Sequence, residues 1–179
     1  MKKYLILLIS LLLSYSCNQT KKKSESIHKY KISLNSKNDS GTSGLVTIKQ
    51  VNNGKVELEA HIMGLNPGNH AIHIHEKADC SSADGKSAGG HWNPTFENHG
   101  SWGNSKGFHR GDIGNFIADE NGHGMMKFAT DLWCLNCDDP IKNIIGKSII
   151  IHDGEDDLTS QPSGAAGARV SCAGIINDF

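Results

Sequence analysis

The chain lacks a sustained helical periodicity, internal repeats and a long apolar run, and its net charge is only -1. The longest mainly apolar stretch, residues 5–13, is too short to span a bilayer as a mature helix. Basic side chains form no cluster beyond residues 21–23, which argues against binding of nucleic acid. The domain is also not preceded by a histidine-rich tail that would gather metal. With 179 residues, the chain has the length of one domain with a single core plus an export segment.

The N-terminus has the pattern of a secretory signal, because Lys2 and Lys3 precede the apolar stretch. Residues 13–17 resemble a bacterial lipoprotein processing site, in which a small residue precedes a cysteine, here Cys17, that becomes lipidated. Ser14 departs from the aliphatic residue usual at its position, and the alternative is an ordinary signal peptide with an incidental cysteine. We expect residues 1–17 to be a signal peptide ending in a lipidated Cys17, and residues 18–28 to be a flexible tether. The protein would then be exported and lipid-anchored in the bacterial cell envelope, on the periplasmic side or at the cell surface.

Short runs of largely alternating apolar and polar residues predict β-strands over much of the remaining chain. The turn residues Asn52, Asn53 and Gly54 separate two of these runs and predict a hairpin, since Asn and Gly tolerate positive φ. The predicted strands are residues 30–34, 45–51, 55–62, 70–76, 112–118, 123–130 and 148–152. The pattern indicates an all-β fold, an antiparallel sandwich or barrel.

Two histidines lie in one of these predicted strands. Residues two apart in a strand project from the same face, so His73 and His75 can reach one ion while Ile72 and Ile74 point to the core. Copper(II) favours several nitrogen ligands in a flattened arrangement, and zinc accepts a tetrahedral set of nitrogen and carboxylate oxygen. The histidines therefore indicate a metal site.

The strand pattern disappears between residues 77 and 110, a segment that holds His91, His99 and His109. A structureless loop of this length in a compact domain is usually functional or disordered. We expect metal ligation to order it, and metal binding to add to the stability of the folded state.

Six motifs, in order, resemble the copper/zinc superoxide dismutase family from about residue 30 to the end of the chain. Each is weak alone, but together and at the spacing of the family they are specific. They are His73-Ile74-His75-Glu76, residues 88–94 around His91, His99-Gly100, His109-Arg110-Gly111-Asp112, residues 146–152 ending in His152, and residues 167–172 with Arg169 and Cys172. The resemblance implies a superoxide dismutase domain over residues 29–179, an antiparallel Greek-key, immunoglobulin-like sandwich or barrel with long metal-binding and active-site loops.

The resemblance also implies a role for each matching residue. Copper would be bound by His73, His75, His91 and His152, and zinc by His91, His99, His109 and Asp112. Asp156 would link a copper histidine to a zinc histidine and fix their ring orientation. A disulfide would join Cys80 and Cys172.

The implied activity is dismutation of superoxide to oxygen and hydrogen peroxide by redox cycling of copper. Arg169 would line the channel beside copper and attract the anion, and His91 would take up a proton. The loop over residues 153–168 departs from the family because it carries acidic residues but no lysine to steer the anion.

Cys134 and Cys137 form an element not associated with the family, for which we expect a local disulfide rather than a zinc or redox site. The neighbouring Trp133 would be a surface aromatic or contact a partner subunit in a possible homodimer. His70 matches a structural histidine that bonds to backbone. The remaining histidines, His28, His61 and His123, are expected at the surface.

Two other functions remain open. One is a copper-binding or copper-delivery lipoprotein of the same fold without turnover; the other is a structural or adhesive sandwich domain stabilised by zinc. The complete ligand set and Arg169 favour the dismutase over both, because stability alone does not require the arginine.

Overall fold

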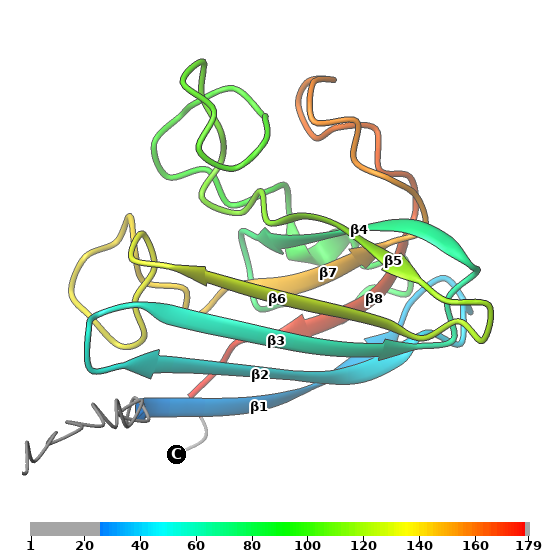
Figure 1. The fold of residues 1–179 in the computed structure, drawn as a ribbon, viewed down its shortest axis with the longest axis horizontal. Coiled ribbons are helices and arrows are strands. Elements are labelled where there is room, and N and C mark those ends of the chain that lie inside the picture. The colour runs from blue at the N-terminus through cyan, green and yellow to red at the C-terminus, as the bar shows by residue number, and fades with distance from the viewer. Residues whose placement is uncertain (1–25, 178–179) are drawn as a thin grey trace, which may run out of the picture.

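A computed structural model describes residues 26–177, which form a closed antiparallel barrel (Figure 1). Its strands are β1 (Ser26–Ser36), β2 (Ser43–Val51), β3 (Val56–Met63), β4 (Gly68–His75), β5 (Gly114–Ala118), β6 (Gly124–Thr130), β7 (Ser148–His152) and β8 (Arg169–Gly174). A single 3-10 turn, η1 (Lys86–Ala88), is the only helical element of these residues. Within the described part of the chain, no helix is long and apolar enough to cross a membrane.

The order of strands around the barrel is β1-β2-β3-β6-β5-β4-β7-β8, with β8 pairing back to β1. The chain therefore jumps from β3 to β4 and returns through β5 and β6, which is the Greek-key connection. This jump places β4 between β5 and β7 and brings two sequence-distant histidine strands side by side. The predicted all-β antiparallel Greek-key fold is confirmed.

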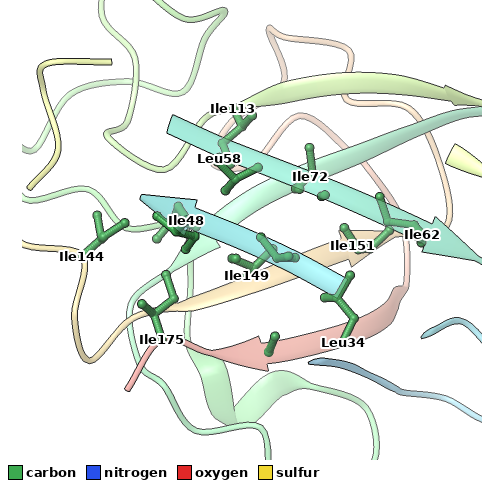
Figure 2. Packing of buried hydrophobic residues seen from close by; sticks show 14 of the residues in the cluster. Leu34, Ile48, Leu58, Ile62, Ile72, Ile113, Ile144, Ile149, Ile151 and Ile175 are labelled. Carbon is green, nitrogen blue, oxygen red and sulfur yellow. The ribbon is translucent and has the colours of Figure 1, made fainter. Parts of the chain in front are cut away.

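The barrel interior is filled by branched aliphatic side chains from all around the sheet (Figure 2). Leu34, Ile48, Leu58, Ile72 and Ile149 are each at most 2% exposed. Pairing of Ile72 with Ile151 and of Ile74 with Ile149 aims these isoleucines inward, so the alternate residues of β4 and β7 face outward.

The outer face of β4 and β7 is nevertheless buried, because the long loop covers it. Ile150 packs outside the barrel against Ala88 and Cys172, and Cys80 packs against the same cluster. The predicted disulfide between Cys80 and Cys172 is present and ties this loop to β8. In Figure 1, the green loop between β4 and β5 and the orange loop between β7 and β8 rise on the same side of the barrel.

The N-terminal boundary of the domain differs from the prediction. The tether was predicted to reach residue 28, but β1 begins at Ser26, which pairs with Val51 of β2. The ladder with β2 continues past the alternating run because backbone hydrogen bonds do not depend on side-chain pattern. Residues 1–25, which include the predicted signal peptide and the predicted lipidation site Cys17, lie outside the described residues.

The segment between β6 and β7 also corrects the sequence interpretation. Cys134 and Cys137 form the predicted local disulfide. Trp133, however, is only 1% exposed and belongs to the main core, so it is neither a surface aromatic nor free to contact a partner subunit.

Candidate metal centre

Four buried histidines gather on the outer face of β4 and β7. His73 and His75 come from β4, His152 ends β7, and His91 forms an isolated bridge with His75 that brings the long loop onto the strand. One nitrogen of each lies within 4.8 Å of those of the others. These are the residues that the resemblance implies for copper.

Hydrogen bonds to the remaining nitrogens orient each ring. His75 Nδ1 lies 3.0 Å from the Gly89 carbonyl and His152 Nδ1 lies 3.4 Å from that of Gly167, so both can donate there. The Nε2 atoms of the same two rings face each other at 3.4 Å. Carbonyl acceptors thus fix the tautomer that leaves Nε2 for a metal ion.

A second buried group consists of His91, His99, His109 and Asp112, again with ligand atoms within 4.8 Å of one another. Asp112 Oδ1 lies 2.9 Å from His91 Nδ1 and 3.2 Å from His109 Nδ1, and Oδ2 lies 3.0 Å from His99 Nδ1. Burial tends to raise the pKa of Asp112, but contacts with the three histidines hold that pKa well below its ordinary value. Three imidazoles and one carboxylate form the ligand set that suits zinc.

His91 belongs to both groups. Its Nδ1 contacts Asp112 and its Nε2 is buried with no hydrogen-bond partner in the described structure. Its ring lies 4.0 Å from the ring of His73, centroid to centroid. One imidazole can therefore ligate two metals, through Nε2 on the His73 side and through Nδ1 on the Asp112 side.

Asp156 links the two groups, as expected. Its two oxygens accept hydrogen bonds from His73 Nε2 at 2.8 Å and His99 Nε2 at 2.9 Å. Burial works against the charged form of Asp156, yet the hydrogen bonds from both histidines lower its pKa overall. Asn115 clamps the backbone of Asp156 in turn, donating to its carbonyl and accepting from its N–H, each at 2.8 Å.

The histidines of the two metal sets differ in the direction of their pKa shifts. Burial lowers the pKa of His75 and His152, and lowers that of His91 to about 4. Burial also acts on His99, but Asp112 and Asp156 outweigh it and raise its pKa to about 9. Near neutral pH the first three are neutral imidazoles, the form that binds metals.

Arg169 reaches from β8 toward this centre. Its Nη1 donates to the Gly85 carbonyl and its Nη2 to the Gly89 carbonyl, both at 2.8 Å. The Gly89 oxygen also accepts from His75, so one backbone carbonyl connects the guanidinium to a copper-set ring. The Cys80–Cys172 disulfide joins the long loop, which carries the two carbonyl acceptors, to β8, which carries Arg169.

Several positioning residues were not found from the sequence. Gln161 makes paired hydrogen bonds at 2.9 Å with the backbone N–H and carbonyl of His99. Gly164 has φ +69, and a Cβ there would lie 1.8 Å from an Asp156 oxygen, so only glycine fits. These contacts span up to 62 residues and leave no local sequence pattern.

The donor atoms fit copper and zinc. The buried nitrogens that make no hydrogen bond in the described residues include His73 Nδ1 and His91 Nε2. His99 Nδ1 and His109 Nδ1 also make none, although they lie 3.0 Å and 3.2 Å from Asp112 oxygens. Such nitrogens are costly to bury without a partner, and a metal ion would satisfy them. As expected, His70 stays outside both sets, with Nδ1 2.9 Å from the His152 carbonyl and Nε2 2.8 Å from that of Asn66, and His28, His61 and His123 are exposed.

A closed Greek-key barrel with one histidine shared by a four-nitrogen and a three-nitrogen, one-carboxylate site defines a two-metal β-barrel protein. The chain belongs to the copper/zinc superoxide dismutase family, whose model, "Copper/zinc superoxide dismutase (SODC)", matches residues 42–175. The predicted family is confirmed, and copper and zinc are the cofactors that the family and the two clusters support.

Relatives of different function resemble the chain to a similar degree. It is 36% identical over 143 residues to superoxide dismutase [Cu-Zn] 5 of Dictyostelium discoideum, covering 76% of this chain and 90% of the relative. It is also 36% identical over 141 residues to the human copper chaperone for superoxide dismutase, covering 74% of this chain but 47% of the chaperone. Among solved structures, a double mutant of a superoxide dismutase-like protein from Bacillus subtilis matches with a TM-score of 0.73 and 31% identity, covering 82% of this chain and 97% of the other.

Proposed function

We propose that the protein is a superoxide dismutase that converts superoxide to oxygen and hydrogen peroxide. The observation that carries the proposal is the guanidinium of Arg169, held by two carbonyls and joined through Gly89 to His75 of a complete copper ligand set. A metal-binding domain that only stores copper has no need of a fixed cation beside its ligands. A small anionic substrate does require one.

Bound copper would supply the one-electron chemistry, taking an electron from one superoxide and giving it to a second, which also gains two protons. Arg169 attracts the anion and can hydrogen-bond it beside the His75 ring. His91 would take up a proton at Nε2, in place of the copper held there, in the first half-reaction and would release it to product in the second, and the other proton of hydrogen peroxide would come from solvent. The zinc set, in which His91 Nδ1 lies beside Asp112, would keep the ring in place while Nε2 changes state.

Copper delivery without turnover is the alternative, because copper chaperones are among the relatives of similar identity. The two functions predict different behaviour of the full chain loaded with copper and zinc. A dismutase turns over superoxide many times and keeps its copper in the presence of an acceptor protein. Full metal loading with negligible turnover and rapid loss of copper to an acceptor would establish delivery instead.

We further propose that the protein acts in the cell envelope, anchored by lipid at Cys17, where it would protect the envelope from superoxide. The N-terminal sequence pattern supports export, and two disulfides suit an oxidising compartment. Metabolic labelling with a fatty-acid analogue should tag the wild-type protein and not a Cys17→Ala variant. Equal labelling of both, or of neither, would refute the anchor.

A further inference from the structure

The zinc-ligand loop has little regular structure, yet its ligands must converge within a narrow space. Residues 93–110 contain no strand, and this stretch supplies His99 and His109. The loop is docked on the barrel by an aromatic cluster, which we define as Trp102, Phe108, Phe128 and Trp133. Trp102 packs 4.7 Å from Phe128 of β6 and 5.8 Å from Trp133, centroid to centroid.

Trp133 also makes one polar contact with the ligand turn. Its Nε1–H donates to the Arg110 carbonyl at 2.8 Å. Arg110 follows the ligand His109, and the turn closes with Asp112 N–H donating to the His109 carbonyl at 3.1 Å. The indole therefore holds the peptide between two ligands of the zinc set.

Trp133 is itself fixed by contacts that do not involve the metal ligands. Cys134 N–H donates to the Lys142 carbonyl at 2.8 Å, and the Cys134 carbonyl accepts from Ile144 at 3.2 Å. Leu135 N–H donates to Gln50 of β2 at 2.9 Å. With the Cys134–Cys137 disulfide, these bonds make the segment a rigid support on the barrel wall.

We propose that Trp133 is a positioning residue for the zinc subsite: its indole N–H, held by the Cys134–Cys137 segment, fixes the His109–Asp112 turn before zinc binds. This gives a role to the sequence element that the superoxide dismutase motifs leave unexplained. It rests on the assignment of zinc to this subsite, but zinc affinity is measured without superoxide, so its failure and that of the dismutase proposal are distinguishable.

The expected change in zinc affinity follows from the position of the Trp133 hydrogen bond. Groups that orient metal ligands typically contribute about 10- to 100-fold in metal affinity. Trp133 acts on the peptide next to a ligand and not on the ligand ring, so about tenfold is expected. Pre-ordering the turn saves the conformational entropy that zinc binding would otherwise have to offset.

The test compares Trp133→Phe with Trp102→Phe in the full chain. Both changes replace an indole of the same cluster with a phenyl ring, but of these two tryptophans only Trp133 donates a hydrogen bond to the ligand turn in the described structure. Zinc affinity is measured by competition with a chromophoric chelator on protein preloaded with copper. Trp133→Phe should weaken zinc binding about tenfold, and Trp102→Phe should change it less than about threefold.

Equal weakening by both variants would show that ring packing and not the N–H sets the turn, and would overturn the proposal, as would no weakening by Trp133→Phe. The free energy of unfolding of the zinc-free variants is measured alongside, since a merely structural role would lower stability without changing zinc affinity. If Trp133→Phe does not fold, hydrogen exchange of the wild-type protein tests the proposal instead. Because coupling is reciprocal, the Trp133 indole proton should exchange more slowly with zinc bound, and an unchanged rate would overturn the proposal.

Discussion

Asp156 hydrogen-bonds His73, which belongs only to the copper set, and His99, which belongs only to the zinc set. A carboxylate can accept from both imidazole N–H groups, whereas an amide of the same shape must turn its NH₂ toward one of them. Asp156→Asn should therefore weaken binding of both copper and zinc, by about 10- to 100-fold each.

Chelator competition for each metal measures this effect, with Asp157→Asn as the matched control. Asp157 is exposed, and its side chain accepts hydrogen bonds only from Thr159 and Ser160 among the described residues. The same loss of affinity in both variants would show that the charge of the loop, and not the Asp156 bridge, supports the metals.

The histidine pKa shifts predict that the metal-free protein is most stable near pH 6.5. Burial lowers the folded-state pKa of His75, His91 and His152 below 6.5, so the unfolded state binds more protons and stability falls as the pH drops below 6.5. His99 behaves oppositely. Its pKa of about 9 means that its contribution is complete below 6.5 and is lost as the pH rises through 9.

Urea unfolding of chelator-treated protein between pH 5 and pH 10 would record this profile. The alkaline loss should be about 3 kcal/mol and should be absent in His99→Gln. A wild-type stability that stays level or rises from pH 6.5 to pH 9 would contradict the assignment of a charged His99 between two carboxylates.

At the scale of elements, the long loop stays on the barrel because it is bonded at both ends of its path. Glu76 and Lys77 N–H donate to the carbonyls of Gly90 and Ala88, each at 3.0 Å, which extends β4 into the loop. Gly111 approaches β4 so closely that a Cβ would lie 2.2 Å from the Ile74 oxygen. The loop thus brings the zinc ligands onto the strand that carries the copper ligands.

The two disulfides should contribute unequally to stability. Cys80 and Cys172 are 92 residues apart, whereas Cys134 and Cys137 are separated by 3. Constraint of the unfolded chain grows with loop length, which predicts losses of about 4–5 kcal/mol and about 2 kcal/mol for the two Cys→Ser pairs. Denaturant unfolding of metal-free variants compares them. An equal or larger loss for the Cys134 and Cys137 pair would show that enthalpic contacts dominate.

At the scale of the whole molecule, the strands and both ligand sets could be predicted because each leaves a local or family-specific pattern. Alternation of apolar and polar residues indicates a half-buried strand, and the spacing of His73 and His75 indicates that both project from one face of it. The start of β1 could not be predicted, since backbone pairing extends it beyond the alternating run. The burial of Trp133 and the clamps of Gln161 and Asn115 also escaped prediction, because each depends on a partner distant in sequence.

The negative charge of the surface around the metal centre increases the importance of Arg169 for attracting an anion. The loop between β7 and β8 exposes Asp153, Glu155 and Asp157 and has no lysine. These carboxylates would repel an incoming anion, so in the proposed reaction the fixed guanidinium is the cation that would draw superoxide to the His75 side of the centre.

The most direct test of the dismutase proposal is kcat/KM for superoxide, measured for the wild-type protein and for Arg169→Ala at matched copper and zinc content. Lys127→Ala, which removes the same charge from the outer face of β6, serves as the control. We predict rapid turnover by the wild type, a fall of about 10- to 100-fold in Arg169→Ala, and little change in Lys127→Ala. Fully metal-loaded wild-type protein without turnover, or an Arg169→Ala variant as active as the wild type, would contradict the account.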